Sequence, residues 1–534
     1  MKSKLYSAFT ALFCAFTILG QCTLFAADRF VSPTGNDSAA GTLNAPWKTI
    51  QKAANTAKAG DVVYIRGGTY VERVQINVSG TATNRIVFRN YEDERPVIDL
   101  ATLSAAQYLT AGIRITDKNY VTIEGIEICN YRTSSDAAVP AGIMVTGGCT
   151  GIMLVGNYIH HIEQNNPETY NYDANAHGIA VYGNSNTAIE GIIICQNQLN
   201  DLRLGASEAI VVNGNVNNFQ ICNNVVHHVN NIAIDAIGYE GTCPTASKDR
   251  ARNGLIAGNK VWATDSSTNP AYGGNFTSGG GARAAAGIYV DGGTKVVIER
   301  NEVWGSNFGV EVASEAEDGV TDYITVRNNI IRHNDGAGII MGGYDENRGS
   351  TENCTIANNT IYMNDVQNVW AGQIQFQFYV KNNKFLNNII WANPSTKQMI
   401  VHYPGSDTAT AAQKEFDSSN VFAYNLYYTV GGSAADAGFV MFTGGSIKGF
   451  DGISAWQRSG KVAGDVGSTF SNPKFVGGTP SITATASQFC IARGSSAINT
   501  GTPSAQYAVT SAQRDFFGLV RLKNARLDRG ADEF

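Results

Sequence analysis

Three carboxylates occupy the variable positions of a short phrase that recurs along the chain: Asp235 and Glu311 the first, and Asp291 the second. The phrase is Gly-Ile-x-Val-x or a near copy, and it carries Asp235 in "AIDAIG", Asp291 in "GIYVDG" and Glu311 in "GVEVAS". Alternate residues of a β-strand face opposite sides, so both x positions face outward if the Ile and Val face a core. Three carboxyl groups on one outer face could serve as the acid and the nucleophile or base that cleave a glycosidic bond.

The spacing of these acids suits that chemistry. Asp291 and Glu311 would lie one strand (~4.8 Å) and two residues (~6.6 Å) apart, about 8 Å between backbones. Carboxyl pairs in glycosidases are separated by ~5–9.5 Å, and crowded acids raise one another's pKa as a general acid requires. We predict Glu311 as general acid, Asp291 as nucleophile or base, and Asp235 as the residue that tunes them or orients the sugar. A solvated acidic surface and a calcium site remain alternative interpretations.

Four long insertions leave the repeat close to these acids. They span residues 163–177, 238–254, 263–287 and 342–353. Long loops on a rigid scaffold commonly carry function, so we predict that they wall a groove. The predicted substrate-binding residues lie in or beside these loops or strands: Tyr239, Tyr272, Tyr289, Tyr344, Glu315 and His177. Basic loop residues could instead bind an acidic sugar or act as the base of a lyase: Lys248, Arg250, Arg252 and Arg283.

The element that must position these residues is a repeat. An Asn-x-apolar-bulky tetrad recurs from "NYIH" at 157 to "NIIW" at 388, at intervals of 27 to 42 residues. An alternating strand precedes each tetrad, and most are followed by a second strand. Stacked coils would set equivalent Asn residues ~4.8 Å apart, so that each amide bonds the next. A β-propeller would need four strands per ~40–45 residues and a blade motif that the sequence lacks.

The pattern therefore predicts an all-β fold, a single-stranded right-handed parallel β-helix. The predicted parts are a signal peptide over 1–27, an N-terminal helical cap over 28–61, the β-helix over 62–430, and irregular final coils with a cap over 431–534. Residues 46–60 place Trp47, Ile50 and Ala53 on one helical face, which suits a lid on the first coil.

The first residues have the pattern of a bacterial Sec-type signal peptide. Lys2 and Lys4 precede an apolar run that ends in the small residues Ala26 and Ala27. We expect a secreted or periplasmic protein. Gln21 before Cys22 disfavours a lipid anchor, and no later segment approaches the ~20 apolar residues of a membrane span.

Composition and cysteine usage exclude several classes. A net charge of −6 argues against a nucleic-acid partner. The cysteines that follow the signal peptide are odd in number and sparse, so no disulfide framework is expected. Cys129, Cys195 and Cys222 are predicted to share one repeat position as buried thiols, and no Cys/His pair has zinc spacing. We expect a monomer that requires no cofactor and has no metal ligands, apart from the calcium alternative.

Both ends of the mature chain resemble a known family. The opening "FVSPTGND" and "GTLNAPWKTIQKAANTAKAGDVVYIRGGTYVERV" and the closing "FSNPKFVGG", "GSSAINTG" and "LDRGADEF" resemble secreted, pectin-lyase-like right-handed β-helix proteins. That superfamily includes polysaccharide lyases, glycoside hydrolases, epimerases and binding proteins. Together with the carboxylates, the resemblance implies a secreted carbohydrate-active enzyme, with a glycoside hydrolase acting on a polysaccharide or oligosaccharide as the leading hypothesis. A lyase of a uronate-containing glycan and a non-catalytic glycan-binding surface protein are the alternatives.

Overall fold

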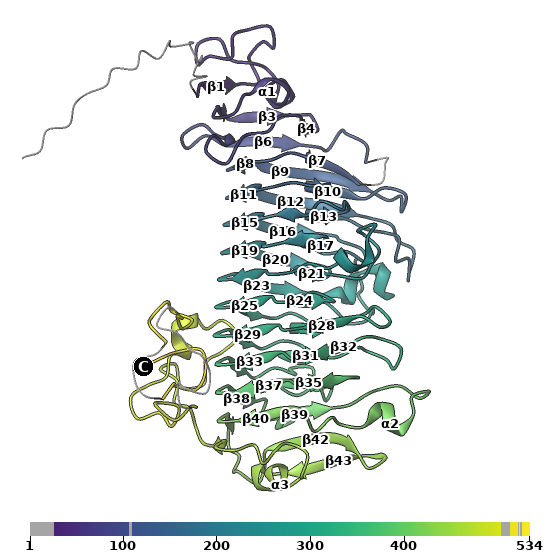
Figure 1. Cartoon of the computed structure of the whole chain (residues 1–534), viewed down its shortest axis with the longest axis vertical. Coiled ribbons are helices and arrows are strands. Elements are labelled where there is room, and N and C mark those ends of the chain that lie inside the picture. The colour runs from purple at the N-terminus through teal and green to yellow at the C-terminus, as the bar shows by residue number, and fades with distance from the viewer. Residues whose placement is uncertain (1–25, 106–108, 503–512, 522, 524–525) are drawn as a thin grey trace, which may run out of the picture.

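The chain winds into a right-handed parallel β-helix, as the repeat predicts (Figure 1). The computed structural model describes residues 26–105, 109–502, 513–521, 523 and 526–534, so residues 1–25 of the predicted signal peptide lie outside it. The described residues form three long sheets of thirteen strands, and most coils contribute one strand to each sheet in turn. In that part of the chain the helices are too short to cross a bilayer.

Each sheet runs the length of the stack. The first sheet extends from β1 (Asp28–Val31) to β40 (Val421–Ala423), and the second from β3 (Gly68–Tyr70) to β44 (Thr469–Phe470). The third sheet is parallel except for its last pair, and its strands are β4 (Val74–Ile76), β7 (Thr110–Thr116), β10 (Pro140–Thr146), β13 (His177–Gly183), β17 (Ile210–Gly214), β21 (Ile234–Ile237), β24 (Ala286–Asp291), β27 (Phe308–Ala313), β31 (Ile339–Met341), β35 (Ile374–Phe376), β39 (Gln398–His402), β42 (Gly438–Thr443) and β43 (Ser446–Asp451).

The two ends of the stack are covered differently. Helix α1 (Ile50–Thr56) buries Ile50 and Ala53 against the first coils, and the Thr49 side chain caps it by accepting from the N–H of Lys52. At the other end, the chain beyond β44 turns back along the side of the stack (Figure 1). There Arg332 of the second sheet donates to the carbonyl of Ile482, and the Tyr362 hydroxyl donates to that of Pro480. The last segment therefore covers part of the second sheet.

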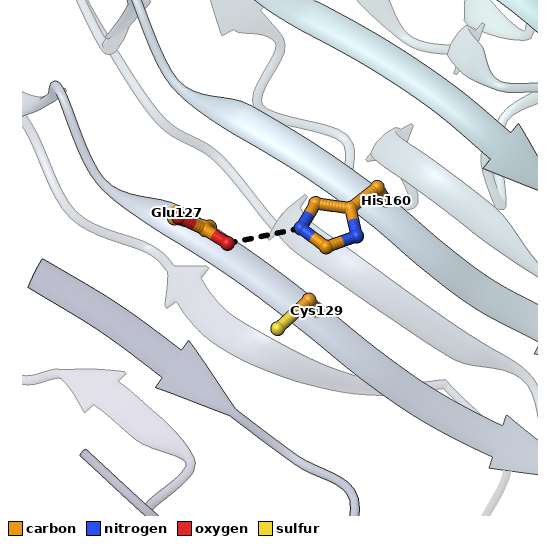
Figure 2. A group of neighbouring side chains, drawn as sticks. All are labelled: Glu127, Cys129 and His160. Carbon is orange, nitrogen blue, oxygen red and sulfur yellow. Dashed lines mark hydrogen bonds and ion pairs between the residues drawn. The ribbon is translucent and has the colours of Figure 1, made fainter. Parts of the chain in front are cut away.

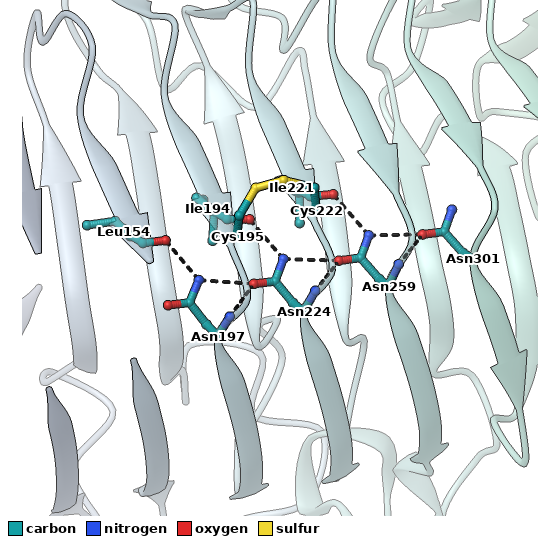
Figure 3. The surroundings of a disulfide bond; sticks show 9 residues. All are labelled: Leu154, Ile194, Cys195, Asn197, Ile221, Cys222, Asn224, Asn259 and Asn301. Atoms are coloured by element: carbon teal, nitrogen blue, oxygen red, sulfur yellow. Dashed lines mark hydrogen bonds between the residues drawn. A yellow bond between two sulfur atoms is a disulfide. The ribbon is translucent and has the colours of Figure 1, made fainter. Parts of the chain in front are cut away.

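The repeated asparagines form a continuous hydrogen-bonded ladder inside the stack. Nine equivalent side chains take part: Asn157, Asn197, Asn224, Asn259, Asn301, Asn329, Asn359, Asn388 and Asn425. Except at the last position, each amide nitrogen donates to the oxygen of the next Asn and to a carbonyl of the preceding coil, as Asn224 does to Asn259 and Ile194 (Figure 3). The predicted ladder is confirmed, and it satisfies buried polar groups at one turn of each coil from Asn157 to Asn425.

The cysteine prediction is wrong in two respects. Cys195 of β15 (Ile193–Cys195) and Cys222 of β19 (Gln220–Cys222) are paired in the first sheet and form a disulfide, with 4.5 Å between their Cα atoms (Figure 3). Cys129 does not share their position, because it belongs to β9 (Glu127–Thr133) of the second sheet. Similar short phrases around the three cysteines concealed that they belong to different strands of the coil.

The disulfide should contribute measurably to stability. It closes a loop of 27 residues, for which chain entropy predicts about 3.5 kcal/mol. Replacing both Cys195 and Cys222 with Ser should therefore lower the free energy of unfolding by about 2–4 kcal/mol, measured by urea denaturation. Reducing the wild-type protein should give the same change, whereas Cys490→Ser should not. A loss below about 1 kcal/mol would contradict the assignment.

Candidate functional site

The outward columns of the third sheet bring the predicted acids together. Asp235 of β21 pairs with Tyr289 of β24, which pairs with Glu311 of β27. Asp291 lies two residues beyond Tyr289 and opposite Ala313. The intervening side chains, such as Ile288, belong to the central core. The predicted alternation is therefore confirmed, and the three carboxylates leave the core on the same side.

A cavity of about 980 Å³ lies over this face of the third sheet. Each of the four predicted loop insertions contributes to its walls, through Tyr172 and Asn175, Glu240 and Thr242, Tyr272 and Arg283, and Tyr344 and Arg348. The floor comes from the strands and the residues beside their ends, including His177, Tyr182, Glu208, Asn213, Tyr289, Glu311 and Gln377. The loops thus enclose the face on which the carboxylates stand.

The predicted site residues divide into two groups. Those that line the cavity are Glu311, Glu315, Tyr289, Tyr272, Tyr344 and His177. Asp235 and Asp291 are only 2% and 6% exposed and lie outside that lining. Tyr239 also lies outside it, with its ring against the guanidinium of Arg250 at 4.9 Å. Of the three predicted catalytic acids, Glu311 therefore lies at the cavity surface, whereas Asp235 and Asp291 are buried.

The cavity is also lined by two acids, Glu208 and Glu240, that the Gly-Ile-x-Val-x phrase did not indicate. Glu208 stands two residues before Ile210, and Glu240 follows the end of β21. Because Ile179 pairs with Ile210, the counterpart of Glu208 in the preceding coil is His177, which also lines the cavity. Reading that column down the stack could have found Glu208. Glu240 belongs to a loop, where no alternation applies.

Glu208, His177 and Tyr182 form a connected polar group at one end of the cavity. The Nδ1 of His177 lies 3.1 Å from the carbonyl oxygen of Glu208, and its Nε2 lies 3.0 Å from the Tyr182 hydroxyl. Burial lowers the pKa of His177 to about 4, so the imidazole is neutral near pH 7. With Nδ1–H donating to the carbonyl, Nε2 accepts from Tyr182 and orients that hydroxyl.

The acids of the site share a strongly perturbed electrostatic environment. Desolvation raises the pKa of Glu311 well above its usual value, and the charges of Glu315 and Asp291 raise it further. Desolvation likewise raises the pKa of Glu208, with Glu240 as the next cause. The pKa of Asp291 is raised in the same way, although its Oδ1 accepts the backbone N–H of Glu315 at 2.7 Å. Crowded carboxyl groups in this cavity therefore hold protons at pH values where exposed acids would lose them.

Glu315 differs from Glu311 in its surroundings. It is exposed at the cavity, and partial desolvation by the walls raises its pKa. Arg348 and a hydrogen bond from Tyr289 oppose that rise, since both favour the ionised carboxylate. The Arg348 guanidinium also donates to the backbone oxygen of Glu315 at 2.9 Å and lies 4.6 Å from the Tyr344 ring centre. Desolvation thus raises the pKa of both carboxyl groups, but only at Glu315 do a neighbouring cation and a hydrogen bond oppose the rise.

Asp235 should reduce stability at neutral pH. Among the described residues its Oδ1 has no hydrogen-bond partner, and desolvation, followed by Glu208 and Asp291, raises its pKa well above the usual value. The folded state then binds a proton that the unfolded state has lost, so stability falls as the pH rises from about 4 through the folded pKa. For every tenfold difference in proton affinity between the two states, this loss reaches about 1.4 kcal/mol once the pH exceeds both pKa values.

Asp235→Asn should therefore increase the free energy of unfolding by about 1 kcal/mol or more at pH 8, and the gain should vanish near pH 4. Urea denaturation across this range measures it. Glu317→Gln, at an exposed acid, is the matched control and should change little at either pH. A gain that is the same at pH 4 and pH 8 would show that Asp235 does not titrate abnormally.

Comparisons with known proteins agree with the fold. Residues 29–164 match the family model "Pel9A-like, right handed beta helix region", and residues 284–462 match "Right handed beta helix region". The uncharacterized protein YwoF of Bacillus subtilis (strain 168) is 37% identical over 446 residues, covering 84% of this chain and 88% of its own. Pectate lyase PEL9 of Emericella nidulans is 40% identical over 134 residues, covering 24% of this chain and 31% of its own.

Some solved structures are similar to this chain at low sequence identity. The pectate lyase Pel9A is 16% identical with a TM-score of 0.44, and the match covers 96% of this chain and 97% of that one. The lacto-N-biosidase of Eubacterium ramulus, native protein, is 15% identical with a TM-score of 0.46 over 75% of this chain and 64% of its own. At these identities the similarity concerns the β-helix alone.

Proposed function

Since the chain belongs to the pectin-lyase-like family of right-handed parallel β-helix proteins that includes YwoF, we propose that it is an exported carbohydrate-active enzyme, specifically a glycoside hydrolase. The walled cavity over the third sheet is its active site. The predicted signal peptide, in which lysines precede an apolar run, supports export. The Cys195–Cys222 disulfide also supports it, because disulfides persist in oxidising compartments.

One observation carries the proposal, namely the pairing of Glu311 with Glu315 in a single enclosed cavity. Desolvation raises the pKa of both groups, but Arg348 and Tyr289 oppose the rise at Glu315, whereas neighbouring charges add to it at Glu311. Glycosidic cleavage needs one carboxyl group that is protonated and one that is ionised on either side of the scissile bond. Environments that separate the two pKa values assign those roles.

In this mechanism Glu311 donates its proton to the glycosidic oxygen as the bond to the anomeric carbon breaks. Glu315 acts from the other side, either attacking that carbon or removing a proton from the attacking water. Asp291 is a positioning residue, because its carboxylate accepts the backbone N–H of Glu315. Asp235 is buried, and desolvation together with the charges of Glu208 and Asp291 raises its own pKa.

The walls suit a neutral sugar. Tyr172, Tyr272 and Tyr344 contribute aromatic rings to the lining, and such rings can pack against the apolar faces of pyranose rings. Among the described lining residues, the carboxyl groups of Glu208, Glu240, Glu311 and Glu315 outnumber the guanidinium groups of Arg283 and Arg348. This balance disfavours a sugar that carries its own carboxylate, because its charge would be repelled by the acid that is ionised in this mechanism, Glu315.

A polysaccharide lyase is the second candidate, and Arg348 is the observation that favours it. Its guanidinium lines the cavity and could neutralise a uronate or remove a proton. The other basic residues considered for this role have partners of their own. Arg250 donates to Gly292 and Gly293 and pairs with Asp322, Arg252 donates to Asn215, and Lys248 donates to the Asn186 carbonyl. Arg283 also lines the cavity, but it pairs with Asp335.

A screen of neutral and acidic plant, algal and host glycans distinguishes the candidates. Hydrolysis produces new reducing ends without new ultraviolet absorbance, whereas a lyase produces unsaturated ends that absorb. We expect reducing ends from a neutral glycan, detected by product chromatography. Unsaturated products would replace the hydrolase with the lyase. Binding that leaves chain length unchanged would identify a glycan-binding protein.

A further inference from the structure

A mixed cluster of possible metal ligands lies on the second sheet, away from the cavity. Glu127 and Cys129 are two residues apart on β9, and His160 lies on the neighbouring strand β12 (Tyr158–Gln164), directly opposite Cys129. Ile128, between the first two, belongs to the central core, so Glu127 and Cys129 face outward. Figure 2 shows the three side chains converging from the two strands.

The distances suit a single bound ion. One ligand atom from each residue can be chosen so that all three lie within 4.8 Å of one another. The Nε2 of His160 is 3.0 Å from Oε1 of Glu127. Ligands at 2.0–2.3 Å around one zinc ion are themselves roughly 3–4 Å apart, so small side-chain adjustments complete the geometry.

We propose that Glu127, Cys129 and His160 bind a divalent cation of intermediate softness, with zinc as the best match. A thiolate, an imidazole and a carboxylate together form a set typical of zinc, whereas calcium and magnesium select oxygen ligands. The side chain of His160 is 14% exposed, so a water molecule can reach the fourth position. Binding displaces the Cys129 thiol proton to solvent as the sulfur–metal bond forms.

The neighbours of the cluster are arranged to support the ligands. The Nδ1 of His160 contacts Nδ1 of His161 at 2.7 Å, which orients the ring and leaves Nε2 directed at Glu127. The amide of Asn130 donates to the Cys129 sulfur at 3.4 Å, a contact that helps to hold the sulfur in place. Arg95 pairs with the other oxygen of Glu127, but its side chain is 68% exposed and can move away at little cost.

Both nitrogens of His160 therefore have partners other than Cys129, and no hydrogen bond between this Cys and His is present in the described chain. This arrangement differs from a Cys–His nucleophile, in which the imidazole bonds the sulfur. Because the ligands come from adjacent coils, the ion would join β9 to β12. It would thus link two coils, as the disulfide links two later coils.

The test uses untagged mature protein, freed of metal by a chelator and then titrated with zinc or with cobalt(II). We expect one zinc equivalent per chain, measured by calorimetry, and a thiolate-to-cobalt charge-transfer band in the near ultraviolet. Cys129→Ser should abolish the band and weaken zinc binding at least about 100-fold. Loss of a residue that only hydrogen-bonds a ligand typically weakens binding about 10–100-fold, so loss of a direct ligand should cost more. Glu127→Gln and His160→Gln should also weaken zinc binding, and calcium should not compete.

Matched controls are Cys490→Ser, at another free cysteine, and His228→Gln, at an exposed histidine. Both should retain the zinc affinity and the cobalt band. Should Cys129→Ser fail to fold, zinc must instead protect Cys129 of the wild type from alkylation, identified by peptide mapping. Equal zinc binding by wild type and Cys129→Ser, or alkylation of Cys129 unaffected by zinc, would overturn the proposal.

Discussion

Glu311→Gln should lower kcat/KM on the natural glycan by about 10³-fold, because the amide cannot supply the proton that the leaving oxygen needs. Desolvation of Glu311 in the cavity, together with the nearby charges of Glu315 and Asp291, raises the pKa of the wild-type carboxyl. Wild-type activity should accordingly persist to a higher pH than an ordinary carboxylic acid would allow and fall as the pH rises through that pKa, since only the protonated acid donates. In the variant this alkaline loss should disappear.

A substrate with an activated leaving group separates an acid from a merely structural residue. An aryl glycoside with an acidic phenol needs no protonation, so Glu311→Gln should cost only about 10-fold on it. Glu315→Gln should impair both substrates alike, because its role does not depend on the leaving group. Glu317→Gln, at an exposed acid near the site, is the control. Equal losses for Glu311→Gln on the two substrates would refute its assignment as the acid.

Asn259→Ala should lower the free energy of unfolding by about 3–5 kcal/mol. The Asn259 side chain is fully buried and takes part in four hydrogen bonds of the ladder. Alanine removes all four and leaves the amide of Asn224 and the carbonyl of Ile221 without those partners. Each buried group that loses its partner costs about 1–3 kcal/mol, partly offset by relaxation.

Urea denaturation of Asn259→Ala, with circular dichroism as the probe, measures this loss. Asn347→Ala is the control, because Asn347 is exposed and its side chain lies outside the ladder. It should change the free energy of unfolding by less than about 0.5 kcal/mol. A loss of similar size in both variants would mean that the ladder contributes little to stability.

The fold and the floor of the site were predictable because both depend on short sequence patterns that repeat along the chain. The Asn tetrad indicated where each coil turns, and the Gly-Ile-x-Val-x phrase indicated which side chains face outward. Strand pairing then placed Asp235, Tyr289 and Glu311 in one column, as the alignment of phrases required. The four long insertions also identified the walls, because they were the departures from an otherwise regular repeat.

Whether each acid is buried or faces the cavity was less predictable. The same outward column contains Asp235, which the structure buries, and Glu311, which it leaves at the cavity surface. Loops that pack over the face decide this difference, and loop conformation does not follow from strand alternation. For the same reason Glu240, a loop residue, could not be placed in the cavity from the sequence alone.

By itself the sequence determined the repeat, the direction of each strand side chain and the likeness of its ends to a β-helix family, since these are properties of residues close together in the chain. Only the tertiary structure decided which distant residues meet, such as Cys195 with Cys222 and Cys129 with His160. The physical reason is that coil length varies from 27 to 42 residues, so contact between coils depends on how each insertion folds out of the stack.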